Sequence, residues 1–82
     1  MNPMWAKIDP ESRGEMFPPC HCKIARHWRA EVFQHFENEF KWMIKADQGH
    51  FVGPIVEAIS KTYPTAHDAM MACDLFVEAV TQ

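Results

Sequence analysis

Apolar residues follow two competing periodicities between Ile24 and Ala46. Every fourth position carries one, a spacing that suits a helix: Ile24, Trp28, Val32, Phe36 and Phe40. Even positions from 24 to 46 are also apolar nine times in twelve, against three in twelve for odd positions 23 to 45, which suits strands. Because aromatic and β-branched residues dominate and Asn38 marks a turn, the pattern predicts strands at about 30–35 and 39–46. A single long helix over 23–46 is the alternative.

The residues around these two strands predict how the sheet continues. Residues 23–29 form either a short helix or an extension of the first strand. Asp47-Gln48-Gly49 predicts a hairpin turn, because Gly49 adopts a positive φ without penalty. A third strand is predicted at about 50–60, where Gly53-Pro54 indicates an edge strand or a bulge.

A capped helix is predicted at the C-terminal end. Thr65 follows a proline and suits an N-cap, and Asp68 lies three residues further on, where a carboxylate favours the helix dipole. Small and apolar residues then form one stripe: Ala69, Ala72, Cys73, Phe76 and Val80. If this stripe covers the sheet, Phe40, Trp42 and Ile44 point toward the helix, and the odd residues of the same strands point away.

The first 22 residues differ in character from the rest of the chain. They contain four prolines and no sustained periodicity, which predicts an extended or irregular arm. Apolar residues in this arm suggest that it docks either on its own sheet or on a partner: Met4, Trp5, Ile8, Met16 and Phe17. The predicted organisation is an arm over 1–22 and one domain over 23–82. The predicted fold is α+β, a three-stranded antiparallel sheet covered on one face by a C-terminal helix.

Length and charge narrow the classes of function. A chain of 82 residues with 48% apolar content forms one small globular domain and leaves little room for an enclosed active site. Net charge is −3, and residues 30–82 hold three lysines against eight acids, a poor match for nucleic-acid phosphates. No apolar run approaches the length of a membrane span, and neither a signal peptide nor a disulfide framework is evident. We therefore expect a cytoplasmic protein with reduced thiols.

The order of these elements is similar to a known family. The segments Val32-Phe33, Phe40 to Ala46, Gln48-Gly49 and Tyr63-Pro64-Thr65 resemble the YegP-like strand–strand–strand–helix repeat. They are also similar to the scaffold of several small phage-encoded anti-CRISPR proteins. The chain differs from the repeat in its Gly53-Pro54 stretch, its single unit and its N-terminal arm. The second resemblance implies a protein that binds a host nuclease complex in the host cytoplasm and blocks it by occlusion.

Two clusters are candidates for other functions. Thiolates and imidazoles are the ligands that Zn²⁺ prefers, and Cys20, His21, Cys22 and His27 lie close in sequence, but one residue between the cysteines is fewer than structural sites use. No residue that would orient a Cys–His27 pair is evident, so we expect no enzyme, no cofactor and no metal. Residues 23–29 form a basic cluster in which Trp28 could stack on a base, and an RNA-binding domain is therefore a further alternative.

The function predicted from these patterns is protein binding without catalysis. Mixed aromatic, methionine and cationic residues on one face are typical of interface anchors. The predicted contact surface combines the open sheet face with the arm: Trp5, Met16, Phe17, Phe33, His35, Lys41, Met43 and Lys45. The predicted partner is a host protein or complex, and a zinc-stabilised module or a YegP-like homodimer remains an alternative.

Overall fold

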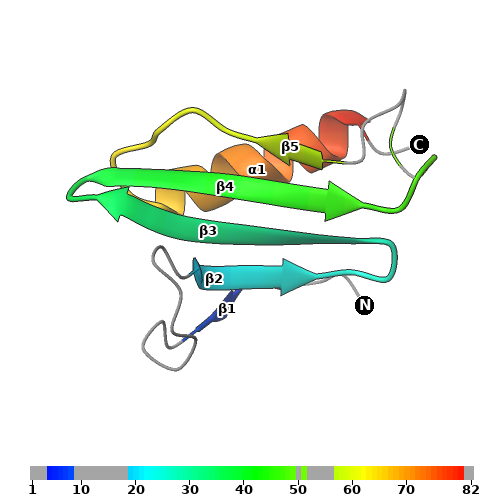
Figure 1. The fold of residues 1–82 in the computed structure, drawn as a ribbon, viewed down its shortest axis with the longest axis horizontal. Coiled ribbons are helices and arrows are strands. Elements are labelled where there is room, and N and C mark those ends of the chain that lie inside the picture. Colours follow the sequence, from blue (N-terminus) through cyan, green and yellow to red (C-terminus); the bar gives the residue numbers. More distant parts are fainter. Residues whose placement is uncertain (1–3, 9–18, 50, 52–56, 81–82) are drawn as a thin grey trace.

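The structure is a computed structural model that describes residues 4–8, 19–49, 51 and 57–80. Its elements are β1 (Ala6–Lys7), β2 (Pro19–Ile24), β3 (Trp28–Phe36), β4 (Glu39–Ala46), β5 (Glu57–Ile59) and α1 (Ala66–Val80). The strands form one antiparallel sheet in chain order, β1 to β5, with α1 on one face (Figure 1). The predicted α+β class is confirmed, but the predicted number of three strands is wrong, because the sheet has five.

Strands β3 and β4 form the central hairpin of the sheet. Their pairing runs from Trp28 opposite Ala46 to Phe36 opposite Glu39, with an irregularity between Gln34 and Phe36. Asn38 closes the two-residue turn at a φ of 58°, a conformation that asparagine tolerates better than most residues. The two predicted strands are confirmed, and the single long helix over 23–46 is wrong.

Strands β1 and β2 extend the sheet into the part of the chain predicted to be an irregular arm. Pro19 opens β2, a position where the missing N–H costs little, and the register shifts between Pro19 and His21. The backbone N–H of Ile8 donates to the carbonyl of Cys20 at 2.8 Å, which ties the first strand to the second. The proline-rich residues 9–18 lie outside the described residues.

The β2–β3 connection is a tight turn. The segment 23–29 is neither a helix nor one continuous strand, because β2 ends at Ile24 and the N–H of Ala25 donates to the carbonyl of Trp28 at 2.9 Å. This turn reverses the phase of the alternation. In β2 the odd residues His21 and Lys23 pair with Val32 and Ala30, so they share the face that the even residues of β3 occupy.

The third predicted strand is found only in part. Strand β5 pairs Ala58 with Ile44, and the backbone of Ser60 and Tyr63 continues along β4 through hydrogen bonds to Trp42 and Phe40. Gly49 adopts a φ of 83°, as the predicted turn requires. The Gly53-Pro54 interruption lies outside the described residues.

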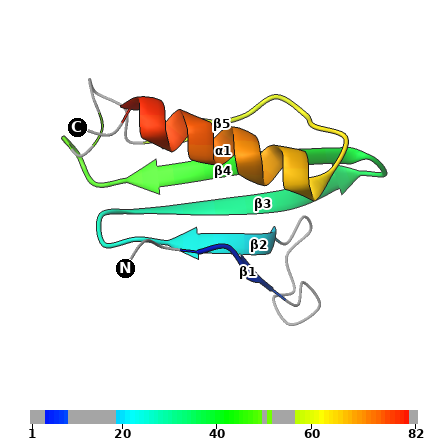
Figure 2. The same ribbon diagram turned by 180° about the vertical axis from the view of Figure 1, so that it is seen from behind.

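Helix α1 begins and packs as predicted. The N–H of Asp68 donates to Thr65 Oγ1 at 3.1 Å, which satisfies one of the free donors of the first turn. The helix lies over β3 and β4, and Figure 2 shows the molecule from the helix side, with α1 in front of the sheet. Its stripe meets the sheet: Ala69 and Cys73 are fully buried, and Ala72, Phe76 and Val80 pack around them.

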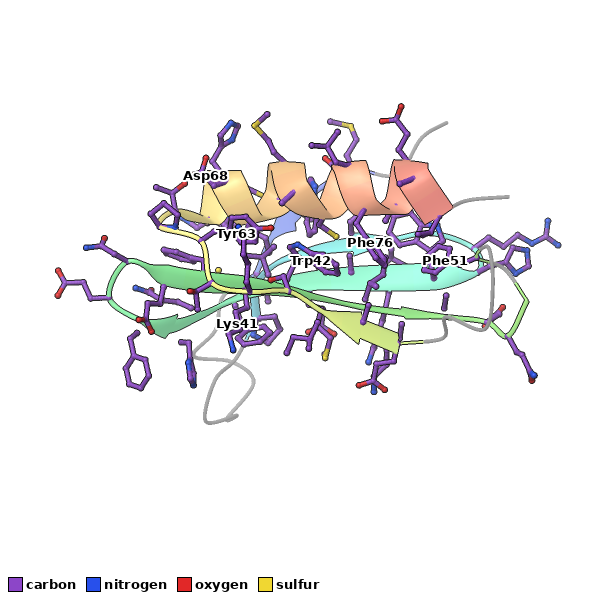
Figure 3. All side chains as sticks on the ribbon, turned by 90° about the horizontal axis from the view of Figure 1, so that it is seen from above. Lys41, Trp42, Phe51, Tyr63, Asp68 and Phe76 are labelled. Carbon is purple, nitrogen blue, oxygen red and sulfur yellow. The ribbon has the colours of Figure 1, made fainter. Side chains whose placement is uncertain are left out.

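The core lies between α1 and the even residues of β3 and β4. Val32, Ile44 and Phe51 are fully buried, and Phe76 contacts the Trp42 ring at a centroid distance of 4.8 Å. Figure 3 shows Trp42, Phe51 and Phe76 in this layer. Burying an Ile or Phe side chain contributes about 1.5–3 kcal/mol, so this layer holds the helix on the sheet. In the described part of the chain, no helix has the length and apolar character needed to cross a bilayer.

Candidate functional site: the open face of the sheet

The face of the sheet opposite α1 carries four rows of side chains. Antiparallel partners project from the same face, so the strand register places their side chains next to each other. The rows are Ile24–Arg29–Lys45–Glu57, Ala6–Cys22–Glu31–Met43–Ile59, Pro19–Phe33–Lys41 and Phe36–Glu39. No described helix or strand packs on this face, and Figure 3 shows Lys41 pointing from it, away from α1. We call it the open face.

Four predicted site residues lie together on the open face. Phe33 and Lys41 are direct cross-strand partners, and Met43 and Lys45 follow along β4 at the strand's two-residue period. Phe33, Lys41 and Met43 are half-buried, while Lys45 is exposed. The alternation of β3 and β4 therefore directs these four side chains away from α1, as predicted.

Not all of the other predicted site residues lie with them. Trp5 lies on the helix side, where its indole Nε1 donates to the Asp74 carboxylate of α1 at 3.1 Å. His35 lies where the β3–β4 register shifts, and its ring contacts Phe36 at a centroid distance of 4.5 Å. Met16 and Phe17 lie outside the described residues. Trp5 and Phe33 therefore lie on opposite faces of the sheet, and their roles in partner binding stay predictions.

The structure adds apolar residues at the margin of the open face that the sequence pattern does not identify. Ile24 is 70% exposed and Ile59 is 59% exposed. Ile24 fits the even-numbered apolar pattern, which predicts a core residue. The β2–β3 turn, however, reverses the phase of the alternation and places Ile24 opposite Arg29 on the open face. A turn recognised at Arg26-His27 is the signal that would have placed Ile24 correctly.

Charges on the open face are concentrated near the β2–β3 turn. Arg29 and Lys45 are direct cross-strand partners, an unfavourable pairing of like charges. Glu57 lies opposite Lys45, and the Glu31 carboxylate lies 3.6 Å from the Arg29 Nε. This end of the face therefore carries two adjacent cations that acids compensate only in part.

The helix side of β2 carries a polar cluster that the sequence does not reveal. The Lys23 Nζ and the Trp5 Nε1 both donate to Asp74, and the Lys23 ammonium lies 5.0 Å from the centroid of the Trp5 ring. Lys23 is thus directed to α1 and separated from Arg26 and Arg29. The predicted basic cluster over 23–29 is divided between two faces.

The candidate zinc ligands are also divided. His21 pairs with Val32 on the helix side and Cys22 pairs with Glu31 on the open face, while the Cys20 thiol contacts the Val32 carbonyl at 3.4 Å. Burial raises the pKa of the Cys20 thiol, and burial together with the nearby Lys7 charge lowers the pKa of His21. Among the described residues, no three His, Cys, Asp or Glu side chains are grouped to hold a metal ion.

His27 belongs to a different part of the molecule from the cysteines. Its Nδ1 lies 3.0 Å from an Asp47 carboxylate oxygen, beyond the C-terminal end of β4. A nucleophilic thiol needs a base within hydrogen-bond reach and a lowered pKa. The Cys20 thiol instead contacts a backbone carbonyl, and its pKa is raised. Cys20 and His27 therefore do not form the nucleophile–base pair considered from the sequence.

No family model, curated protein or solved structure matches this chain. The resemblances to the YegP-like repeat and to anti-CRISPR proteins therefore remain predictions, and the functional argument rests on the open face.

Proposed function

We propose that the protein is a non-enzymatic module that binds another protein through the open face. The observation that carries this proposal is the one-sided architecture. In the described part of the chain, a single helix packs on one face of the five-stranded sheet, over β3 and β4, and the opposite face presents apolar and cationic side chains.

The composition of the open face supports this function. Interfaces are enriched in aromatic residues, methionine and arginine at their centre. Phe33 and Met43 lie near the middle of the face and are half-buried by their neighbours, so little side-chain entropy remains to be lost on docking. Ile24 and Ile59 extend the apolar surface toward the edges. A partner with a complementary apolar surface would bury these side chains together.

A matched pair of substitutions tests the proposal. Met43→Lys places a charge at the centre of the open face, and Met71→Lys makes the same change on the outer side of α1, where Met71 is 53% exposed. A partner captured from host lysate by the wild-type chain is purified and titrated against each variant. Met43→Lys should weaken binding at least tenfold, as loss of an interface anchor of about 1.4 kcal/mol or more does, while Met71→Lys should not.

A second pair guards against misfolding of the Met43 variant. Ile59→Lys and Leu75→Lys alter side chains that are 59% and 66% exposed, so both should fold normally by circular dichroism. Equal binding by wild-type, Met43→Lys and Ile59→Lys chains would refute docking on the open face. A dimer in light scattering that both open-face variants dissociate would show that a second copy of the chain occupies this face, and the proposal of a different partner would fail.

For the partner class, we propose a host nuclease complex of a CRISPR system, blocked by occlusion. The support is the resemblance of the hairpin-and-helix segments to anti-CRISPR proteins. Adding the purified protein to reconstituted nuclease complexes should inhibit cleavage, and Met43→Lys should relieve the inhibition while Met71→Lys does not. Unchanged cleavage at saturating protein would exclude the complexes tested.

A further inference from the structure

A shallow depression of about 410 Å³ lies where the β2–β3 turn meets the end of β4. In Figure 1 the two segments lie at the same end of the sheet. The turn supplies one wall, residues 24–29, and the end of β4 supplies the other, residues 45–47. The volume falls in the range of small-molecule sites.

The lining of this depression is positively charged, although the chain as a whole has a net charge of −3. Arg26, Arg29 and Lys45 contribute three cations against the single carboxylate of Asp47. Asp47 is itself directed to His27, at 3.0 Å. The depression therefore holds three cations against one carboxylate, a surplus of two positive charges.

The sheet register places two of these cations next to each other. Arg29 and Lys45 are direct cross-strand partners, and like charges in that relation destabilise a sheet. Within the described residues, Glu31 reaches only the Nε of Arg29, at 3.6 Å, and Arg26 and Lys45 make no ion pair. An anion bound between the two strands would relieve this repulsion.

We propose that this depression binds a phosphate group, either free or as part of a small phosphate ester. A phosphate monoester carries about 1.5 to 2 negative charges near neutral pH, which matches the two uncompensated cations better than a carboxylate does. Arginine guanidinium groups bind phosphate oxygens through paired N–H donors, and lysine adds a point charge. The site does not depend on protein docking through the centre of the open face.

The test is a titration of the isotope-labelled full chain with inorganic phosphate, followed through backbone amide and tryptophan indole NMR signals. Sodium chloride at equal ionic strength is the control for screening. Phosphate should produce saturable shifts at residues 24–29 and 45–47 and at the Trp28 indole. Shifts that chloride reproduces, or that spread over the protein without saturation, would overturn the proposal.

Variants localise the site. Arg29→Gln and Lys45→Gln should each weaken phosphate binding about two- to fivefold, the factor expected for one exposed ion pair. Lys61→Gln is the matched control, because Lys61 is exposed and lies near Tyr63, whose backbone pairs with the opposite end of β4. Equal binding by Lys45→Gln and Lys61→Gln would refute the site.

A parallel titration with adenosine monophosphate separates the two sources of the phosphate group. Tighter binding than inorganic phosphate, with shifts at the same residues, would assign a phosphate ester whose organic part uses the remaining volume. Equal or weaker binding at these residues would assign the free ion.

Discussion

Replacing Asp74 tests how the N-terminal strand is held against the helix. Helix α1 lies over β3 and β4, so the neighbouring part of the same face, on β2, is covered by Trp5 instead. The Asp74 carboxylate accepts hydrogen bonds from Trp5 Nε1 at 3.1 Å and from Lys23 Nζ at 2.5 Å. Asp74→Ala removes both bonds and leaves the Lys23 ammonium, whose side chain is only 12% exposed, without its partner.

The expected loss of stability follows from these contacts. A partly exposed ion pair contributes about 0.2–1 kcal/mol, and the hydrogen bond from the indole to a charged acceptor adds about 1 kcal/mol after allowance for solvent. Alanine is the better helix former by up to about 0.7 kcal/mol, which offsets part of the loss. Asp74→Ala should therefore lower the free energy of unfolding by about 0.5–1.5 kcal/mol, a substantial part of the few kilocalories expected for a domain of this size.

Urea unfolding followed by circular dichroism and tryptophan fluorescence measures this change. Glu78→Ala is the control, because Glu78 is an exposed acid on the same helix and makes no ion pair within the described residues. A double-mutant cycle with Lys23→Gln should give a coupling energy of about 0.5 kcal/mol or more. If Asp74→Ala is as stable as Glu78→Ala and the coupling is zero, Asp74 does not hold this edge of the sheet.

Three further predictions concern the helix cap at Thr65, the turn at Gly49 after β4, and the buried thiol of Cys73. Thr65→Ala removes the acceptor for the Asp68 N–H and should cost about 0.5–2 kcal/mol in urea unfolding, whereas Thr65→Ser should cost little. Gly49→Ala should cost about 1–2 kcal/mol, because a Cβ at a φ of 83° is strained although nothing lies within 4 Å of it; no loss would contradict the left-handed turn. Burial raises the pKa of Cys73 to about 12, so its thiol should react with a disulfide reagent far more slowly than Cys22 until urea unfolds the chain. Because the unfolded thiol ionises at lower pH than the folded one, the contribution of Cys73 to stability is complete below its ordinary pKa of 9.0 and is lost as pH rises toward 12; Cys73→Ala should flatten this alkaline loss.

Local sequence patterns were sufficient to predict the central hairpin and the helix. The strong alternation of residues 30–46 and the turn at Asn38 identify β3 and β4, and the cap at Thr65 with its apolar stripe identifies α1. The same alternation correctly directs Phe33, Lys41, Met43 and Lys45 away from the helix. These features depend on residues a few positions apart in the chain. Sequence periodicity describes the chain over this same short range.

Strands β1 and β2 could not be predicted in the same way. Prolines at 18 and 19 and the absence of alternation indicate an irregular segment, yet residues 19–24 pair with β3 because its edge offers unpaired backbone groups. The exposure of Ile24 also depends on this pairing, because the Arg26-His27 turn reverses the phase of the alternation between β2 and β3. Neither outcome is visible without the partner strand.

Four features of the fold follow from the amino-acid pattern alone: the α+β class, the central hairpin, the capped helix and the division of β3 and β4 into a buried and an exposed face. They depend on the periods of the two kinds of secondary structure. Three other features are seen only in the folded chain: the sheet has five strands, Trp5 and Lys23 meet Asp74, and Arg29 and Lys45 lie side by side. Sequence patterns do not predict these features because strand pairing joins residues far apart along the chain, and its register depends on how the backbone groups and side chains of both partners fit together.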